Sequence, residues 1–200
     1  MRKLGTAAER REQIRAAASA AFAEAGLHGV SVDQIARSIG ISEAYVFRLF
    51  GSKRALFIEV VTSAFDTMTS LMVSAAADTS GVDALMRMGE EYQAQLADRQ
   101  RLQLQLQAFA ACGDPEVLFA VRAAFGRVWT RAGQISGLSP LQVKTFMAFG
   151  TLLNIVAAMD AGALPVSWAE EATDPVPAAL YLSGGMTQLA WLDGKRDSAR

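Results

Sequence analysis

Residues 29–42, GVSVDQIARSIGIS, carry the start of one short helix, its end and the start of the next. Ser31 and Gln34 have capping-box spacing, in which a hydroxyl and an amide satisfy free backbone N–H groups at a helix start. Gly40 can end that helix, and Ser42 then stands where a second N-cap is expected. Two short helices joined by a tight glycine turn form a helix-turn-helix.

Apolar residues follow helical spacing in the three segments around this turn. The segment before it carries a stripe that ends at Gly26, made of Ile14, Ala17, Ala18, Ala21, Phe22 and Ala25. The segment within it has an inner face of Val32, Ile35, Ala36 and Ile39. In the segment after it the inward positions are Val46, Leu49 and Phe50, and the outward or flanking ones are Glu43, Ala44, Tyr45 and Arg48. The four outward residues are therefore free to meet a partner.

The rest of the chain also has helical rather than alternating periodicity, which predicts an all-α fold. A long amphipathic helix of about six turns is expected after the turn at 51–53. Further helices are expected at roughly 82–96, 101–111, 115–135, 140–161 and 176–192. The segment 162–177 holds three of the five prolines and is expected to be a surface loop, with at most a short turn around Trp168.

Charge is distributed unevenly along the chain. Residues 1–54 hold nine Lys/Arg against five Asp/Glu, a balance of +4, whereas the remaining residues hold ten against fifteen, a balance of −5. A basic head on an acidic body is typical of a nucleic-acid-binding module joined to a non-binding one. Ordinary variation in surface charge is the alternative. We predict two domains, 1–54 for DNA binding and 55–200 for regulation and dimerisation.

Composition argues against several other classes of protein. Cys112 is the single cysteine and cannot form an internal disulfide, and the start MRKLGTAAERR lacks the apolar core of a secretion signal. The longest uncharged stretch, 145–159, is shorter than the roughly 20 apolar residues of a membrane span. One histidine and one cysteine provide neither a His-rich metal cluster nor a Cys-His pair, and the chain has no GK[ST] loop. We expect a cytoplasmic protein that is not an enzyme and has no cofactor or metal.

The segment GVSVDQIARSIGISEAYVFRLFGSKRALF, residues 29–57, resembles the DNA-binding domain of the tetracycline-repressor (TetR) family. The shared pattern is a helix ending in Gly, a Val-Ser start, Ile-Ala in the second helix, a Gly turn, an aromatic third helix ending in Phe, and then Ser-Lys. It covers about residues 8–60. The chain departs from the pattern at Tyr45 and Phe47, where the family often has a small residue and then a phosphate-binding Tyr, and at Leu49, where it usually has an aromatic residue.

The resemblance implies that the third helix enters the major groove of double-stranded DNA. The candidate DNA-binding residues are Ser31, Ser42, Glu43, Ala44, Tyr45, Phe47, Arg48 and Lys53. Arg48 can pair with guanine in a bidentate way, worth about 1–3 kcal/mol of discrimination. The helix N-termini at both serines, together with Lys53, favour phosphate. Tyr45 is open to a base or to a phosphate.

Each of these residues also has a plain structural interpretation. The two serines cap helices in any protein, Lys53 can be a solvated turn residue, and Phe47 can pack between helices. The basic arm Arg2, Lys3, Arg10 and Arg11 can follow the DNA or be an ordinary tail.

In the larger domain the resemblance implies a ligand-binding body and a homodimer built on the last two long helices, 140–161 and 176–192. The dimer-interface candidates are small or polar: Ala148, Gly150, Thr151, Asn154, Ala157, Ala158 and Ala161. The candidates for an apolar ligand pocket are Met68, Met72, Phe109, Phe119, Phe125, Trp129 and Phe146. For both sets an ordinary intramolecular core is the alternative.

The function predicted from the sequence is that of a homodimeric repressor, released from a pseudo-palindromic operator by a small apolar effector. Two alternatives stay open. The chain could be a helical module that binds a protein, or a regulator that activates or organises DNA without a ligand.

Overall fold

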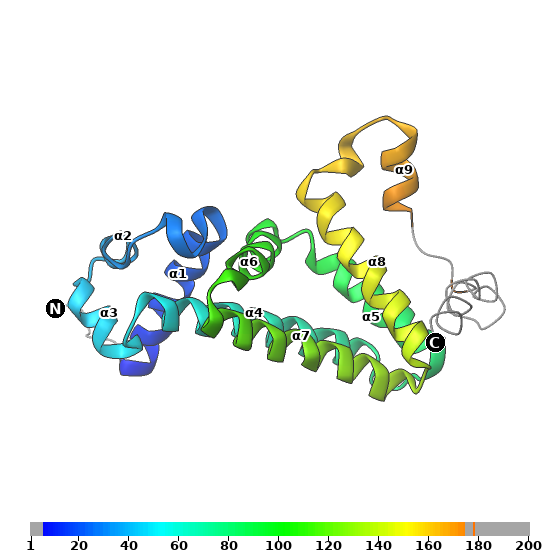
Figure 1. The fold of residues 1–200 in the computed structure, drawn as a ribbon, viewed down its shortest axis with the longest axis horizontal. Helices are drawn as coiled ribbons and strands as arrows, with labels where there is room; N and C mark the ends of the chain where they lie inside the picture. The colour runs from blue at the N-terminus through cyan, green and yellow to red at the C-terminus, as the bar shows by residue number, and fades with distance from the viewer. Residues whose placement is uncertain (1–5, 175–177, 179–200) are drawn as a thin grey trace, which may run out of the picture. The chain divides into compact units, whose positions relative to one another are not determined.

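The computed structural model describes residues 6–174 and 178, and within them every regular element is helical (Figure 1). The predicted all-α fold is therefore confirmed. The elements are α1 Ala7–Gly29, α2 Val32–Ser38, α3 Glu43–Phe50, α4 Lys53–Ala75, α5 Gly81–Gln95, α6 Arg99–Ala110, η1 Ala111–Gly113, α7 Pro115–Ser136, α8 Pro140–Ala158, η2 Ala161–Ala163 and α9 Ser167–Thr173. The helices predicted between residues 82 and 161 lie within a few residues of their observed bounds. The helix expected at 176–192 falls outside the described residues.

The prediction for 162–177 was wrong in one respect, because it contains a short helix, α9, rather than at most a turn around Trp168. No side chain caps this helix. Its support is tertiary: Ala169 is buried in a small cluster with Val156 and Ala161. Periodicity within the segment does not reveal such support, which comes from α8 and η2.

The chain divides into two compact units. The first runs through Thr69 and includes Gln95–Val128, so α6 joins the three N-terminal helices, and α6 packs extensively against α1. Its core includes Phe22 of α1 and Phe57 of α4, whose rings meet edge to face at 5.0 Å. The division of function after Arg54 stays a prediction.

The second unit comprises Ser70–Ala94 and the chain from Trp129 onward. In Figure 1 the chain turns after α8, and α9 packs back against the end of that helix. Tyr92 of α5 donates a hydrogen bond to Asn154 of α8, and both side chains are buried.

α4 and α8 are each long and apolar enough to cross a membrane, by length and composition alone. This is weak evidence for a membrane, because core helices of soluble proteins pass the same test. Within the most apolar window, 44% of α4 is buried but only 22% of α8. The apolar character of α8 is thus largely unexplained by packing within the described chain.

Candidate nucleic-acid interface

Both helix starts in the helix-turn-helix are capped as the sequence predicts. Ser31 Oγ accepts from the Gln34 N–H at 3.1 Å, and Gln34 Oε1 accepts from the Ser31 N–H at 2.7 Å, which completes a capping box. Ser42 Oγ accepts from the Tyr45 N–H at 3.3 Å at the start of α3. Since both hydroxyls are used as caps, the groups that these helix starts offer to a phosphate are mainly backbone amides.

The turn between α2 and α3 requires glycine. Gly40 has φ +68°, a left-handed conformation that favours a residue without Cβ. The Ile41 N–H donates to Ala36 O and the Gly40 N–H to Arg37 O, which together form a Schellman motif. This motif ends α2 abruptly and fixes the direction in which the chain enters α3.

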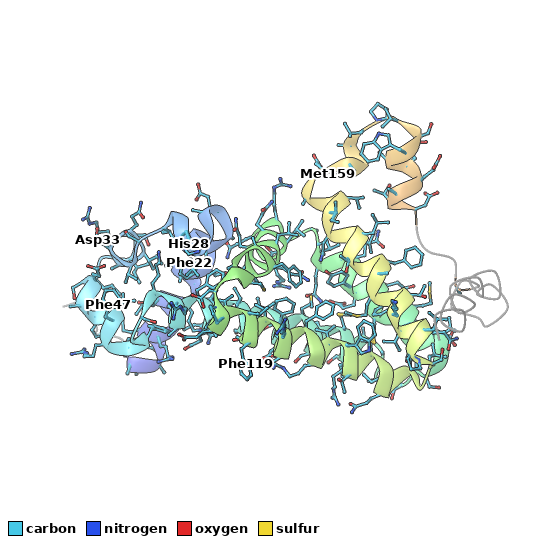
Figure 2. The ribbon with its side chains drawn as sticks, in the orientation of Figure 1. Phe22, His28, Asp33, Phe47, Phe119 and Met159 are labelled. Atoms are coloured by element: carbon cyan, nitrogen blue, oxygen red, sulfur yellow. The ribbon has the colours of Figure 1, made fainter. Side chains whose placement is uncertain are left out.

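α3 separates its residues into an inner and an outer face, although Leu49, expected to point inward, is only half-buried. Val46 and Phe50 are buried, while Glu43, Ala44 and Arg48 are exposed and Tyr45 is half-buried. Phe47, marked on α3 in Figure 2, is 40% exposed, so it lies on the outer surface and is not packed between helices. The outer face therefore combines charged, small and aromatic side chains.

The guanidinium of Arg48 lies over the Tyr45 ring, with Cζ 4.7 Å from the ring centroid. Among the described residues Arg48 forms no ion pair. Its charge is thus left available on the exposed side of α3.

Most other arginines of the N-terminal helices are neutralised within the chain. Arg11 and Arg15 pair with Glu59, Arg37 with Asp33, and Arg54 with Asp114 and Glu116. Between residues 6 and 54, the cations without a carboxylate partner in the described chain are Arg10, Arg48 and Lys53. The positive balance of this region is consequently concentrated on fewer residues than the sequence count suggests.

Lys53 connects the start of α4 to the α1–α2 junction. Its Nζ donates to Val30 O at 3.0 Å. An ammonium has three donors, so this bond leaves others for a phosphate beside Ser31. The prediction that Lys53 contacts DNA is untested and is compatible with this position.

Arg11 has a position that the sequence did not reveal. It makes a bidentate pair with Glu59 of α4, donates to Leu49 O of α3 at 3.0 Å, and lies 4.4 Å from the centroid of the Phe50 ring. These partners occupy it inside the domain, so it is not a member of a free basic arm. Its contacts are 38 to 48 residues away in the chain, and no local pattern signals them.

The candidate pocket residues do not form one group. Phe65, Phe109 and Phe125 form a chain of edge contacts at 5.9 and 6.2 Å in the first unit. Met68 lines a small recess of about 10 Å³ between α4 and α6, roughly room for one water molecule, together with Val61, Ala64, Phe65, Arg101, Leu104 and Gln105. Met72, Trp129 and Phe146 belong to the second unit.

Phe119 does not line this recess: its side chain is 78% exposed and extends away from α7 in Figure 2. The buried face of this part of α7 is Val117, Val121, Ala124 and Val128. A residue two positions after Val117 points to the opposite side of the helix.

The dimer-interface candidates on α8 and in η2 also divide between exposed and buried positions. Ala148 and Thr151 are exposed, but Asn154 and Ala161 are buried within the chain, and a Cβ on Gly150 would meet the Tyr92 ring at 3.6 Å. The exposed stripe of α8 consists instead of Leu141, Lys144, Ala148, Thr151, Leu152, Ile155 and, at its C-cap, Met159. It is mainly apolar.

Among the described residues, no group of three or more His, Cys, Asp or Glu side chains could hold a metal ion.

The chain is similar to known bacterial regulators. A family model described as bacterial regulatory proteins, tetR family, matches residues 14–60. The HTH-type transcriptional activator FasR of Mycolicibacterium smegmatis is 31% identical over 101 residues, which cover 50% of this chain and 39% of that protein. The match thus spans well under two thirds of this curated relative.

Two solved structures illustrate the likeness in fold. A putative TetR-family transcriptional regulator from Mesorhizobium loti is 28% identical, with a TM-score of 0.60 over 84% of this chain and 92% of that chain. The fatty acid degradation regulator FadR from Bacillus halodurans is 18% identical, with a TM-score of 0.65 over 90% and 98% of the two chains. The second likeness shows the fold alone.

Proposed function

We propose that this chain, which belongs to the TetR family of DNA-binding transcription regulators, is a homodimeric cytoplasmic repressor that a small apolar ligand releases from a pseudo-palindromic operator. The observation that carries the proposal is the outer face of α3. It exposes Glu43, Ala44 and Arg48 beside Tyr45, whereas most nearby arginines are paired inside the chain. An α-helix with such a face fits the major groove.

Side-chain chemistry indicates which part of the DNA each residue contacts. Arg48 donates to guanine, Glu43 accepts from cytosine, and Ala44 or Phe47 contacts a thymine methyl. Lys53 and the amides at Ser31 and Ser42 bind phosphates and set the register without reading sequence.

The exposed stripe of α8 supports the proposal that two copies of the chain form a homodimer. Leu152, Ile155 and Met159 are 41%, 48% and 55% exposed and follow one another along one side of the helix. An apolar stripe of this kind is stabilised when a second copy covers it, and two-fold symmetry places the same stripe on both sides of the interface. The pair of recognition helices would then contact half-sites about 34–36 Å apart.

We place the ligand at the recess between α4 and α6, whose free volume of about 10 Å³ means that the surrounding side chains have to move apart when a ligand binds. The recess is apolar except for Arg101 and Gln105, and Met68 can adapt to ligands of varied shape. A ligand lowers operator affinity only when it binds the DNA-free arrangement of the dimer more tightly than the DNA-bound one.

The test is selection of bound duplexes from a random DNA pool, followed by affinity measurements on the winner against salt. We expect a two-fold symmetric winner and steep salt dependence, since each neutralised phosphate contributes about 0.9 to the log–log slope. Arg48→Ala should relax the selected sequence, whereas the control Arg87→Ala on α5 should select the same one. Absence of enrichment over random DNA would contradict the proposal and favour a protein partner.

Activation is the second candidate, because the relative FasR is described as an activator. A reporter gene fused to the selected site distinguishes the two. Deletion of the regulator raises expression under repression and lowers it under activation.

A further inference from the structure

Within residues 6–174, the contact with the Tyr45 ring is the one interaction of the Arg48 side chain, and this stacked pair lies on the exposed side of α3. The residues are three positions apart, so their side chains leave neighbouring points of the helix surface. The backbone of Tyr45 is fixed at the helix start by the Ser42 cap, to which its N–H donates at 3.3 Å. The ring therefore stands on a residue whose backbone is anchored, and it has fewer rotatable bonds than the arginine side chain.

Bidentate recognition of a guanine requires two N–H groups of the guanidinium to donate to N7 and O6 in the plane of the base. A free arginine has many rotamers, and fixing one of them reduces the free energy gained on binding. A cation held over an aromatic face has fewer accessible orientations before the DNA arrives. The ring can thus improve recognition without touching the DNA.

We propose that Tyr45 is a positioning residue, whose ring rather than hydroxyl holds the Arg48 guanidinium for bidentate recognition of a guanine. This inference rests on the proposed DNA-binding function. It differs from a direct role for Tyr45 at a phosphate or a base edge, because each direct role uses the phenolic O–H.

The test measures a specificity ratio, defined as affinity for the selected operator divided by affinity for the same duplex with the Arg48-dependent guanine replaced. Tyr45→Leu should lower this ratio about two- to fivefold for each half-site, the effect of losing one exposed cation–π contact. The conservative variant Tyr45→Phe should restore the ratio. In an Arg48→Ala background, Tyr45→Leu should have no further effect on it.

Pentafluorophenylalanine at position 45 provides a second variant that keeps the shape of the ring. Fluorine withdraws electron density from the ring face and removes its attraction for a cation, so the ratio should again fall relative to Tyr45→Phe. Melting curves and affinity for random DNA at low salt verify that each variant is folded.

Three results would overturn the inference: an unchanged ratio in Tyr45→Leu, equal ratios for the phenyl and pentafluorophenyl rings, or a uniform loss of affinity on all duplexes in Tyr45→Phe. The last result would assign the hydroxyl to a phosphate. Failure of the wild-type chain to select any duplex is a different outcome, because it contradicts the proposed function itself.

Discussion

α3 and α8 expose opposite kinds of side chain. α3 buries Val46 and Phe50 and exposes charged residues, whereas α8 leaves a stripe that includes Leu152 and Ile155 exposed. A charged face is well solvated without a partner. Covering an exposed apolar stripe is favourable by about 25 cal/mol for each Å² of apolar surface removed from water. α3 is therefore suited to reversible binding of a partner such as DNA, whereas α8 favours permanent contact with another apolar surface.

The largest effect is expected from Ile155→Asp on the α8 stripe. In a symmetric dimer this places two carboxylates in an apolar interface, where burying unpaired charge costs several kcal/mol. We expect monomers in sedimentation velocity and a loss of operator affinity of about a hundredfold or more. Ala123→Asp on the exposed side of α7 is the control and should remain dimeric. A dimeric Ile155→Asp would show that the stripe is not the interface.

The opposite side of α8 should affect stability without affecting assembly. Tyr92→Phe leaves the buried Asn154 Oδ1 without its phenolic donor, and an unsatisfied buried polar group costs about 1–3 kcal/mol. Urea denaturation should reveal this loss, while the dimer dissociation constant should change little. An equal change in both quantities would place Asn154 at the interface, as the sequence first suggested.

These two faces show how far sequence reasoning extends. The caps at Ser31 and Ser42, the Gly40 turn and the burial of Val46 were predictable, because each depends on residues within one or two helical turns. The inward direction of Asn154 was not, because it depends on the position of Tyr92, 62 residues away. A polar residue among small ones looks the same in sequence whether it faces its own chain or another.

α9 and Arg11 illustrate the same limit. α9 forms where Ala169 packs against α8, although its own sequence has no cap and few periodic positions. Arg11 belongs to a basic N-terminal run, yet its guanidinium donates hydrogen bonds to Glu59 and to the Leu49 carbonyl inside the domain. Local propensity predicts which segments become helices, and tertiary contacts determine which partners their side chains meet.

A smaller effect is expected from Arg11→Met, which keeps the apolar stem but removes the donors to Glu59 and to the end of α3. Because the pair is 43% and 31% exposed, its contribution to stability should be about 1 kcal/mol. The outer face of α3 keeps its own side chains, so it should bind the same bases. Its affinity should fall, because α3 loses the hydrogen bond from Arg11 to the Leu49 carbonyl. Operator affinity should therefore fall about threefold with an unchanged selected sequence.

Glu59→Gln is the companion variant for Arg11→Met, because it weakens the same pair from α4. The double variant should be no weaker than the worse single one, as expected for residues that act together. A changed sequence preference in Arg11→Met would instead place this arginine in contact with DNA.

The smallest effect is expected from Arg37→Ala on α2. Arg37 pairs with Asp33 one turn earlier, and its side chain is 77% exposed. Such exposed i,i+4 pairs contribute about 0.3–0.5 kcal/mol, and the loss should be close to the limit of measurement in denaturation curves. Because Asp33 already neutralises Arg37, the salt dependence of operator binding should keep its slope.

Lys53→Ala should instead reduce the slope by about 1, since no carboxylate in the described chain competes with phosphate for that ammonium. Equal slopes for the two variants would contradict the assignment of free positive charge to α3 and the start of α4.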